Sequence, residues 1–199
     1  FTLAKSEKRK RPLAICALKN SNIIYGEYNN NPDRDPVHVW LSKDGGISWS
    51  VMYTFNNIRH IHGLFHDPYT DKTWITTGDS DSESIIWRTD EHFNKLEYII
   101  GGNQLCRAVQ LLFTEDCIYY GTDTPLEQNY ICRMNRNTNE VERLQKVDSS
   151  VFWGCKVNNN LFFSTTIEPS KINTTKYSVV WGSENGVLWK PLDKFKKDL

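Results

Sequence analysis

Arginine recurs along this sequence at a regular interval. Three arginines each stand just before an apolar run, and successive members are 48 residues apart: Arg11, Arg59 and Arg107. Acidic residues close the apolar run that follows each of them, at Glu27, Asp79 and Asp123. Arginine binds carboxylates through two parallel hydrogen bonds, whereas Asp and Glu hold sugar hydroxyls or exchange protons with a substrate. These residue types predict a site for an anionic carbohydrate, with Asp79 and Asp123 as candidate catalytic residues.

Further ring-bearing residues accompany this pattern. His60 and His62 follow Arg59, and Trp153 lies in a later apolar run, where its ring could stack on a sugar face. His60 and His62 are alternate residues of one predicted strand, so they share a face and could be two ligands of a metal ion. The sequence identifies no third ligand, so neither a metal nor another cofactor is predicted. The arginines and acids could also pair with each other in a purely structural role.

A repeated structural unit is needed to bring these residues together. Near-continuous apolar runs, rich in β-branched and aromatic residues and joined by Asn/Asp turns, are typical of hairpins covered on both faces. Four such hairpins occur, at 13–18 with 23–27, 61–66 with 74–79, 108–113 with 117–123, and 151–157 with 161–166. A more amphipathic hairpin follows each one, at 37–41 with 49–53, 84–88 with 96–100, 130–134 with 140–144, and 178–181 with 187–189.

The spacing of these hairpins predicts the fold class. Their outer turns, at Asp44, Asp90, Asn135 and Glu184, are separated by 46, 45 and 49 positions. Four strands about every 45 residues is the period of a propeller blade, whereas a sandwich has no reason to keep such a spacing. We therefore predict an all-β chain with almost no helix: one β-propeller domain, or part of a larger propeller, of four-stranded antiparallel blades. The approximate blades are 11–56, 57–101, 105–147 and 149–193.

The blade geometry explains why the candidate residues should form one site. In a four-stranded antiparallel blade, the start of strand one and the end of strand two lie on the same rim. If the blades are related by rotation about a channel, the arginines and acids converge at one mouth, with His60, His62 and Trp153 nearby.

One outer turn carries a recognisable motif. It reads Ser42-Lys43-Asp44-Gly45-Gly46-Ile47-Ser48-Trp49 and resembles the Asp box, or BNR repeat, of the sialidase-like propeller superfamily. A degenerate copy spans 182–189. The resemblance implies a structural motif: a carboxylate that accepts backbone N–H bonds, a glycine with positive φ and a tryptophan packed beneath. Its members here are Ser42, Asp44, Gly46 and Trp49.

The same resemblance directs attention to the opposite rim. In that superfamily the Asp box lies on the face away from the active site, where sialidases hold a substrate carboxylate with an arginine cluster. This chain shows no Arg-Ile-Pro segment near its start and no identifiable Tyr/Glu nucleophile pair, which argues against sialidase activity itself.

Composition restricts the partners. Lys+Arg and Asp+Glu both number 24, so neither nucleic acid nor an anionic membrane is an expected partner. No 18-residue apolar stretch occurs, and residues 1–10 lack the hydrophobic core of a signal peptide, so we expect a soluble protein of undetermined compartment. The five cysteines lack the spacing of a zinc site and are expected as buried thiols.

Two classes of function follow. The first is a glycoside hydrolase or lyase acting on an acidic glycan, which the arginines hold by its carboxylate. The second is a non-catalytic scaffold that binds glycan or protein on the same rim. Three arrangements would close a ring: the four blades by themselves, self-association, or further blades outside this segment, and the sequence leaves all three open.

Overall fold

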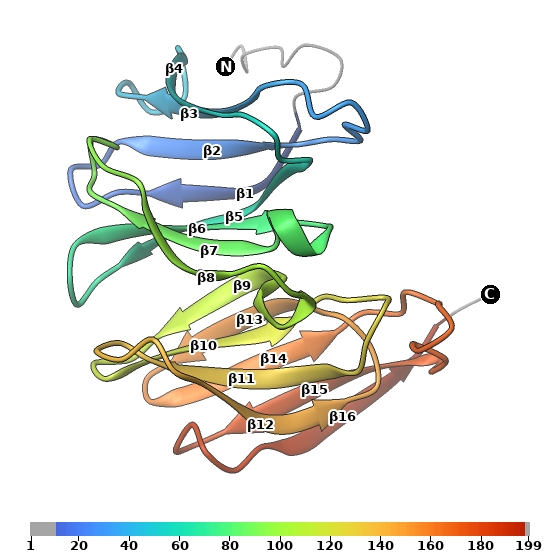
Figure 1. Cartoon of the computed structure of the whole chain (residues 1–199). Helices are drawn as coiled ribbons and strands as arrows, with labels where there is room; N and C mark the ends of the chain where they lie inside the picture. Colours follow the sequence, from blue (N-terminus) through green and yellow to red (C-terminus); the bar gives the residue numbers. More distant parts are fainter. Residues whose placement is uncertain (1–10, 198–199) are drawn as a thin grey trace. The chain divides into compact units, whose positions relative to one another are not determined.

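The computed structural model describes residues 11–197 and divides the chain into two compact units, one ending at Asn103 and the other starting at Gln104. Residues 1–10, which we expected to lack a signal peptide, lie outside the described range. Each unit contains two four-stranded antiparallel sheets, in which the strands pair in chain order (Figure 1). These are the four predicted propeller blades, and the all-β fold class is confirmed.

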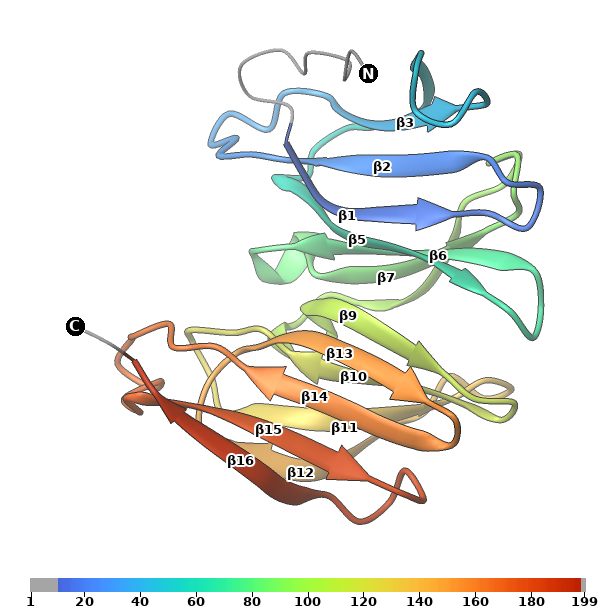
Figure 2. The ribbon, with the colours of Figure 1, turned by 180° about the vertical axis from the view of Figure 1, so that it is seen from behind.

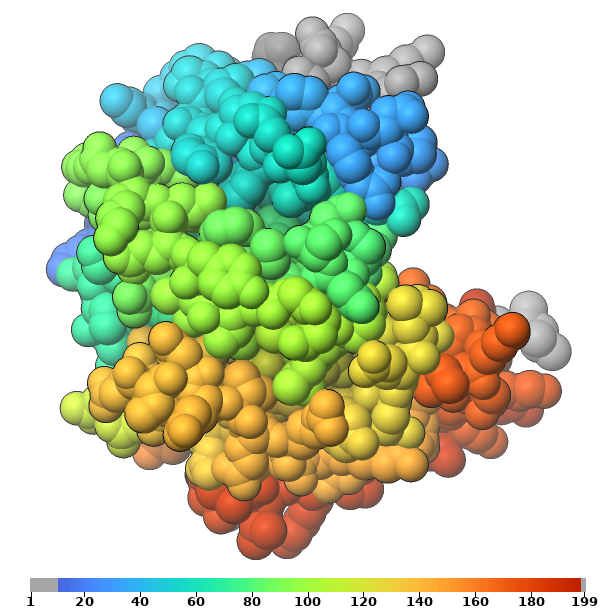
Figure 3. All heavy atoms as spheres, in the orientation of Figure 1, coloured from blue at the N-terminus to red at the C-terminus, as the bar shows by residue number. Residues whose placement is uncertain are grey.

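The first unit contains blades 1 and 2. Blade 1 consists of β1 (Arg11–Ala17), β2 (Ile23–Tyr28), β3 (Val37–Ser42) and β4 (Ser50–Phe55). Blade 2 consists of β5 (His60–Asp67), β6 (Lys72–Gly78), β7 (Ile85–Thr89) and β8 (Glu97–Gly101), with a short 3-10 turn, η1 (Asp81–Glu83), before β7. In the space-filling view, blade 1 is coloured from blue to cyan and blade 2 from cyan to green (Figure 3).

The second unit contains blades 3 and 4. Blade 3 follows the 3-10 turn η2 (Gln104–Cys106) and consists of β9 (Ala108–Phe113), β10 (Cys117–Thr122), β11 (Asn129–Asn135) and β12 (Val141–Val147). Blade 4 consists of β13 (Val151–Val157), β14 (Asn160–Thr165), β15 (Tyr177–Ser183) and β16 (Lys190–Lys196). No helix in the described part of the chain is long and apolar enough to cross a membrane.

The inner strands of each unit supply its core. In the first unit β5 packs against β1 and β2 (Figure 2), where Ile24, Val39 and Ile61 are almost fully buried. Gly26 permits this approach, because a Cβ at that position would lie 2.5 Å from Cγ2 of Ile61. In the second unit β13 packs against β9 and β10, and Val151 is buried in a cluster with other residues: Ile131, Leu161 and Phe163. β5 and β9 are buried on both faces, as their near-continuous apolar runs predicted, whereas several residues of β1 and β13 are exposed.

The last strand does not lie where it was predicted. The sequence indicated a strand at 187–189, but β16 runs from Lys190 to Lys196 and every one of its residues is exposed. Such a strand leaves no hydrophobic pattern, because its order comes from backbone pairing with β15. Trp189, which suggested the strand, is instead buried just before it.

The Asp44 turn has the hydrogen bonding that its residues predict. The Asp44 carboxylate accepts N–H bonds from Ile47 and Ser48, and the Ser42 hydroxyl accepts one from Gly46, whose φ is 91°. Hydrogen bonds from the Ser48 side chain and backbone contribute most to lowering the pKa of Asp44 to about 2. Trp49 donates its indole N–H to the Gly46 carbonyl. The motif is a local turn that closes β3 onto β4.

Blade 4 repeats this turn with a different residue from the one predicted. Asn185, and not Glu184, accepts the N–H bonds of Val187 and Leu188, while Ser183 accepts that of Gly186. Ser183 and Asn185 therefore correspond to Ser42 and Asp44. Gly186 directly follows Asn185, whereas Gly46 lies two residues after Asp44. Aligning the two motifs on their glycines therefore placed Glu184, and not Asn185, opposite Asp44.

Candidate functional site

The first strand of every blade carries one extra residue near its start. In blade 2, Ile61 faces Thr77 and Gly63 faces Thr76, so β5 gains a residue at His62. The other blades have equivalent register shifts, between Pro12 and Ile15, between Ala108 and Leu111, and between Val151 and Trp153. Bulges of this kind re-aim side chains and are common beside functional sites. They mark the rim where the sequence places its arginines and acids.

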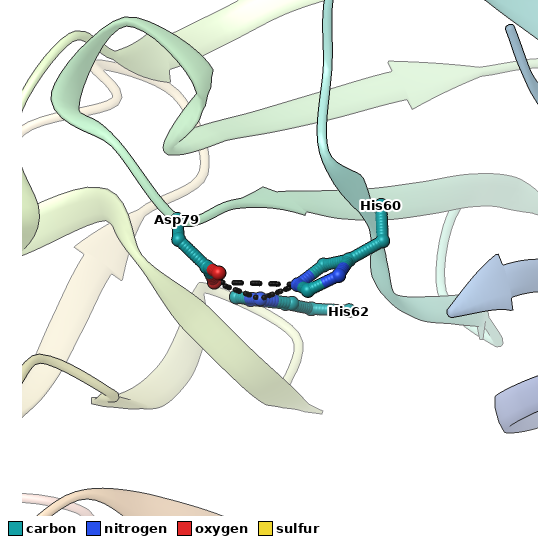
Figure 4. A group of neighbouring side chains, drawn as sticks. All are labelled: His60, His62 and Asp79. Carbon is teal, nitrogen blue, oxygen red and sulfur yellow. Dashed lines mark hydrogen bonds and ion pairs between the residues drawn. The ribbon is translucent and has the colours of Figure 1, made fainter. Parts of the chain in front are cut away.

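Two histidines and one aspartate meet at this rim of blade 2. His60 pairs across the sheet with Gly78, and Asp79 follows directly, so the start of β5 lies beside the end of β6. The Nε2 atoms of His60 and His62 are 3.1 Å apart, and Oδ1 of Asp79 lies 3.2 Å from the first and 3.1 Å from the second (Figure 4). Both imidazoles are buried, with 5% and 1% of their residue surface exposed. We call these three side chains the His-His-Asp cluster.

A backbone carbonyl fixes the tautomer of His60. Its Nδ1 lies 2.9 Å from the carbonyl oxygen of Asn29, which can only accept a hydrogen bond, so Nδ1 carries a proton. In a neutral imidazole Nε2 is then a bare lone pair that faces the other two members of the cluster. Hydrogen bonding of this kind commonly orients a catalytic or metal-binding imidazole.

Packing holds both rings in place. The ring of Tyr28, at the end of β2, lies 4.2 Å from that of His60 between centroids. On the other side, Gly78 leaves room for His62, because a Cβ at Gly78 would lie 2.7 Å from Cε1 of that ring. The His-His-Asp cluster itself belongs to blade 2, and residues of both blades of the first unit hold its rings in place.

Arg59 covers the outer side of Asp79. Its Nη1 lies 3.1 Å from Oδ2 of Asp79, and its Nη2 donates to Oδ1 of Asn30 at 2.8 Å. The backbone N–H of Arg59 is held by the Glu83 carboxylate. About a third of the arginine side chain, 35%, is exposed, so a ligand from solvent can reach the guanidinium. Asp79 thus uses one oxygen for Arg59 and the other for the imidazoles.

The second unit contains a related but more buried group. Nε of Arg107 lies 3.5 Å from Oδ2 of Asp123, whose side chain is 3% exposed. Oδ1 of Asp123 and Oε2 of Glu168 are both buried, and neither accepts a hydrogen bond within the described part of the chain. Burial raises the pKa of Glu168, and the nearby Asp123 carboxylate raises it further. The protonated, uncharged form of Glu168 is therefore favoured in these surroundings.

The remaining predicted residues lie in other surroundings. Glu27 is buried, and its carboxylate accepts N–H bonds from the His38 backbone and the Trp40 indole. Arg11 is exposed at the first position of β1. Trp153 is 56% exposed on β13. The two predicted arginine–acid pairs that form, Arg59 with Asp79 and Arg107 with Asp123, each lie within one blade, not between neighbouring blades.

Sequence reasoning missed several contributors. Tyr28 and Asn30 come directly after Glu27, the acid that was predicted to lie at the rim. Their position in the chain could therefore have identified them as rim residues. Glu168 lies in the irregular segment between β14 and β15, where no periodicity predicts what a side chain faces.

Comparison with known proteins identifies the fold but no family. No family model matches the sequence, and no curated protein matches it. Among solved structures, a putative TolB from Agrobacterium tumefaciens has a TM-score of 0.62 at 12% identity, over 88% of this chain and 62% of that one. TolB from Acinetobacter baumannii has a TM-score of 0.65 at 12% identity, over 96% and 46%.

A third similar structure is an oligogalacturonate lyase in complex with manganese, with a TM-score of 0.57 at 10% identity, over 94% of this chain and 54% of that one. The chain thus spans about half to three fifths of the length of these proteins. At such low identity the likeness is one of fold, and it agrees with the propeller blades described above.

Proposed function

We propose that this chain is a carbohydrate-active propeller that binds an anionic glycan at the rim of blade 2, with Arg59 as the ligand of the sugar carboxylate. The observation that carries this proposal is the position of Arg59. Its guanidinium is partly exposed and stands beside two imidazoles and a carboxylate. A guanidinium in such a place can bind a carboxylate through two parallel hydrogen bonds.

The neighbouring groups extend the proposal to a reaction class. Removing a proton next to a uronate carboxylate, the first step of a lyase reaction, needs a cation on the carboxylate and a base nearby. Arg59 supplies the cation, and Asp79 with its imidazoles supplies proton-accepting groups. One of the proteins with a similar fold is an oligogalacturonate lyase, so the fold is compatible with this ligand class. Membership of the sialidase-like superfamily, suggested by the Asp44 turn, is part of the same proposal.

Binding assays on defined sugars test the proposal. Oligogalacturonate, oligoglucuronate, sialyllactose and a neutral oligosaccharide are titrated calorimetrically into the protein. We expect binding of an acidic sugar and none of the neutral one, and we expect Arg59→Ala to lower the affinity at least 10-fold, since charge-assisted hydrogen bonds contribute about 1.5–3 kcal/mol. Ultraviolet absorbance of an unsaturated product then separates a lyase from a binding module.

A matched control guards against a loss of folding. Arg88 also lies in blade 2 and pairs with an acid, Glu97, at 2.8 Å, but it stands near the other end of the sheet. Arg88→Ala should retain glycan affinity. Equal losses in both variants, or unchanged affinity in Arg59→Ala with its thermal transition intact, would reject Arg59 as the carboxylate ligand.

A further inference from the structure

We propose that the His-His-Asp cluster binds a divalent transition-metal ion. The sequence offered two ligands and no third, and the structure supplies Asp79 as the third.

The ligand atoms already have the spacing of a coordination site. The three distances among Nε2 of His60, Nε2 of His62 and Oδ1 of Asp79 are 3.1, 3.1 and 3.2 Å. Metal bonds to imidazole nitrogen and carboxylate oxygen are about 2.0–2.2 Å long, so an ion equidistant from these atoms would have ligand–metal–ligand angles of about 90–105°. These values lie between octahedral and tetrahedral geometry. No ligand has to move for the three atoms to form one face of a coordination shell.

The orientation of His60 also favours a cation among the three ligand atoms. Because the Asn29 carbonyl accepts a hydrogen bond from Nδ1 of His60, Nε2 of the neutral imidazole presents a lone pair toward Oδ1 of Asp79, 3.2 Å away. A divalent cation placed among the three atoms would be attracted by all of their lone pairs.

The groups that contact the ligand side chains from outside are of the kinds found around metal sites. The Asn29 carbonyl orients His60, and Arg59 binds the carboxylate oxygen of Asp79 that faces away from the histidines. Such outer partners fix the tautomer of an imidazole and the direction of a carboxylate. The rings are buried while the Asp79 side chain is 20% exposed, so further coordination positions can face solvent.

The donor set selects the class of metal. Two imidazoles and one carboxylate favour Zn²⁺, Mn²⁺, Fe²⁺ or Co²⁺, whereas Ca²⁺ and Mg²⁺ prefer all-oxygen sites. Three protein ligands with positions left open are the pattern of catalytic rather than structural sites. On the basis of the proposed function, those open positions would take the carboxylate of an acidic sugar next to Arg59, and in the metal-bound protein the three ligand atoms would no longer serve as proton acceptors.

Metal titration of the whole chain tests the inference without any sugar. After chelator treatment and dialysis, Zn²⁺, Mn²⁺ and Mg²⁺ are each titrated by calorimetry, and thermal melting is recorded with and without metal. We expect one transition-metal ion per chain, a raised melting temperature and no binding of Mg²⁺. His62→Ala and Asp79→Ala should each weaken metal binding by more than about 100-fold, because loss of an outer partner alone costs about 10–100-fold.

A histidine outside the cluster serves as the control. His66 lies on the same strand and contacts Asp71 instead, so His66→Ala should retain full metal affinity. Zn²⁺ binding that survives in His62→Ala, or that His66→Ala reduces equally, would overturn the inference, as would the absence of binding by any transition metal. Arg59→Ala separates the two proposals, since it should lose glycan affinity but weaken metal binding by no more than about 10–100-fold, the cost of an outer partner, which is less than His62→Ala does. Metal binding without glycan binding refutes only the proposed function.

Discussion

At the scale of single residues, the carboxyl groups of Asp79 and Glu168 differ in the charged groups that surround them. Asp79 faces Arg59 and two imidazoles and lies partly in solvent. Glu168 faces the buried Asp123, whose partner Arg107 also approaches it, and burial together with Asp123 raises the pKa of Glu168. The second arrangement makes ionisation of Glu168 costly in the folded state.

This difference predicts a pH-dependent effect of Glu168→Gln. The folded-state pKa of Glu168 lies above its unfolded value, so its favourable contribution is complete below the unfolded pKa and is lost as pH rises through the folded pKa. Glutamine cannot ionise. We therefore expect the stability of the variant, relative to wild type, to increase from acidic to alkaline pH. Urea unfolding between pH 4 and pH 8 measures this change.

Glu115→Gln is the matched control, because Glu115 is an exposed glutamate of the same unit. Its stability difference from wild type should stay flat with pH. A flat difference in Glu168→Gln as well would show that burial and Asp123 do not raise the pKa of Glu168 in the folded protein.

At the scale of elements, the sequence predicted hairpins well and the details of strand pairing poorly. Apolar runs such as 108–113 and 151–157 coincide with β9 and β13, because apolar and β-branched residues leave a strong composition signal, although only β9 is buried on both faces. β16 was misplaced because all its residues are exposed. The bulge at His62 leaves no composition signal, since it depends on how the strand pairs with its neighbour.

The same limit applies to the candidate site. Arg59, His60, His62 and Asp79 were each predicted as rim residues, and the structure brings them together. The contact of Asp79 with both histidines depends on the bulge, so the sequence offered no third metal ligand. Glu27 satisfies the same pattern as Asp79, yet it binds the indole of Trp40, a neighbour set by pairing in blade 1.

Gly78 gives a direct test of how the sheet positions His62. Alanine there would place Cβ 2.7 Å from Cε1 of the imidazole, so the ring has to shift. We expect Gly78→Ala to lower the free energy of unfolding by about 1–3 kcal/mol, the usual cost of overpacking. It should also move the imidazole signals of His60 and His62 in nitrogen-detected NMR spectra.

A double-mutant cycle identifies the contact responsible. In a His62→Ala background the obstructing ring is gone, so adding Gly78→Ala should cost much less than it does in wild type. An equal cost in both backgrounds would attribute the effect to the backbone of β6 and not to the packing of His62.

At the scale of the whole molecule, charge offers little protection against association. Lys+Arg and Asp+Glu both number 24, so proteins at neutral pH repel each other weakly. Alternate residues of β13 are exposed, among them Trp153 at 56% and Val157 at 53%, and Cys155 between them is an exposed free thiol. An apolar strand surface with a reactive group at its centre favours contact between two copies.

We therefore expect covalent dimers to form through Cys155 when reductant is removed. Cys16, Cys106 and Cys132 should not take part, because burial raises their pKa values to about 11, 11 and 12 and keeps them from solvent. Non-reducing electrophoresis after mild oxidation should show a dimer in wild type and in the control Cys117→Ser, and a monomer in Cys155→Ser. A dimer that persists in Cys155→Ser would contradict this prediction, and Cys117→Ser in that background would then show whether the partly exposed Cys117 forms it or a buried thiol has become accessible.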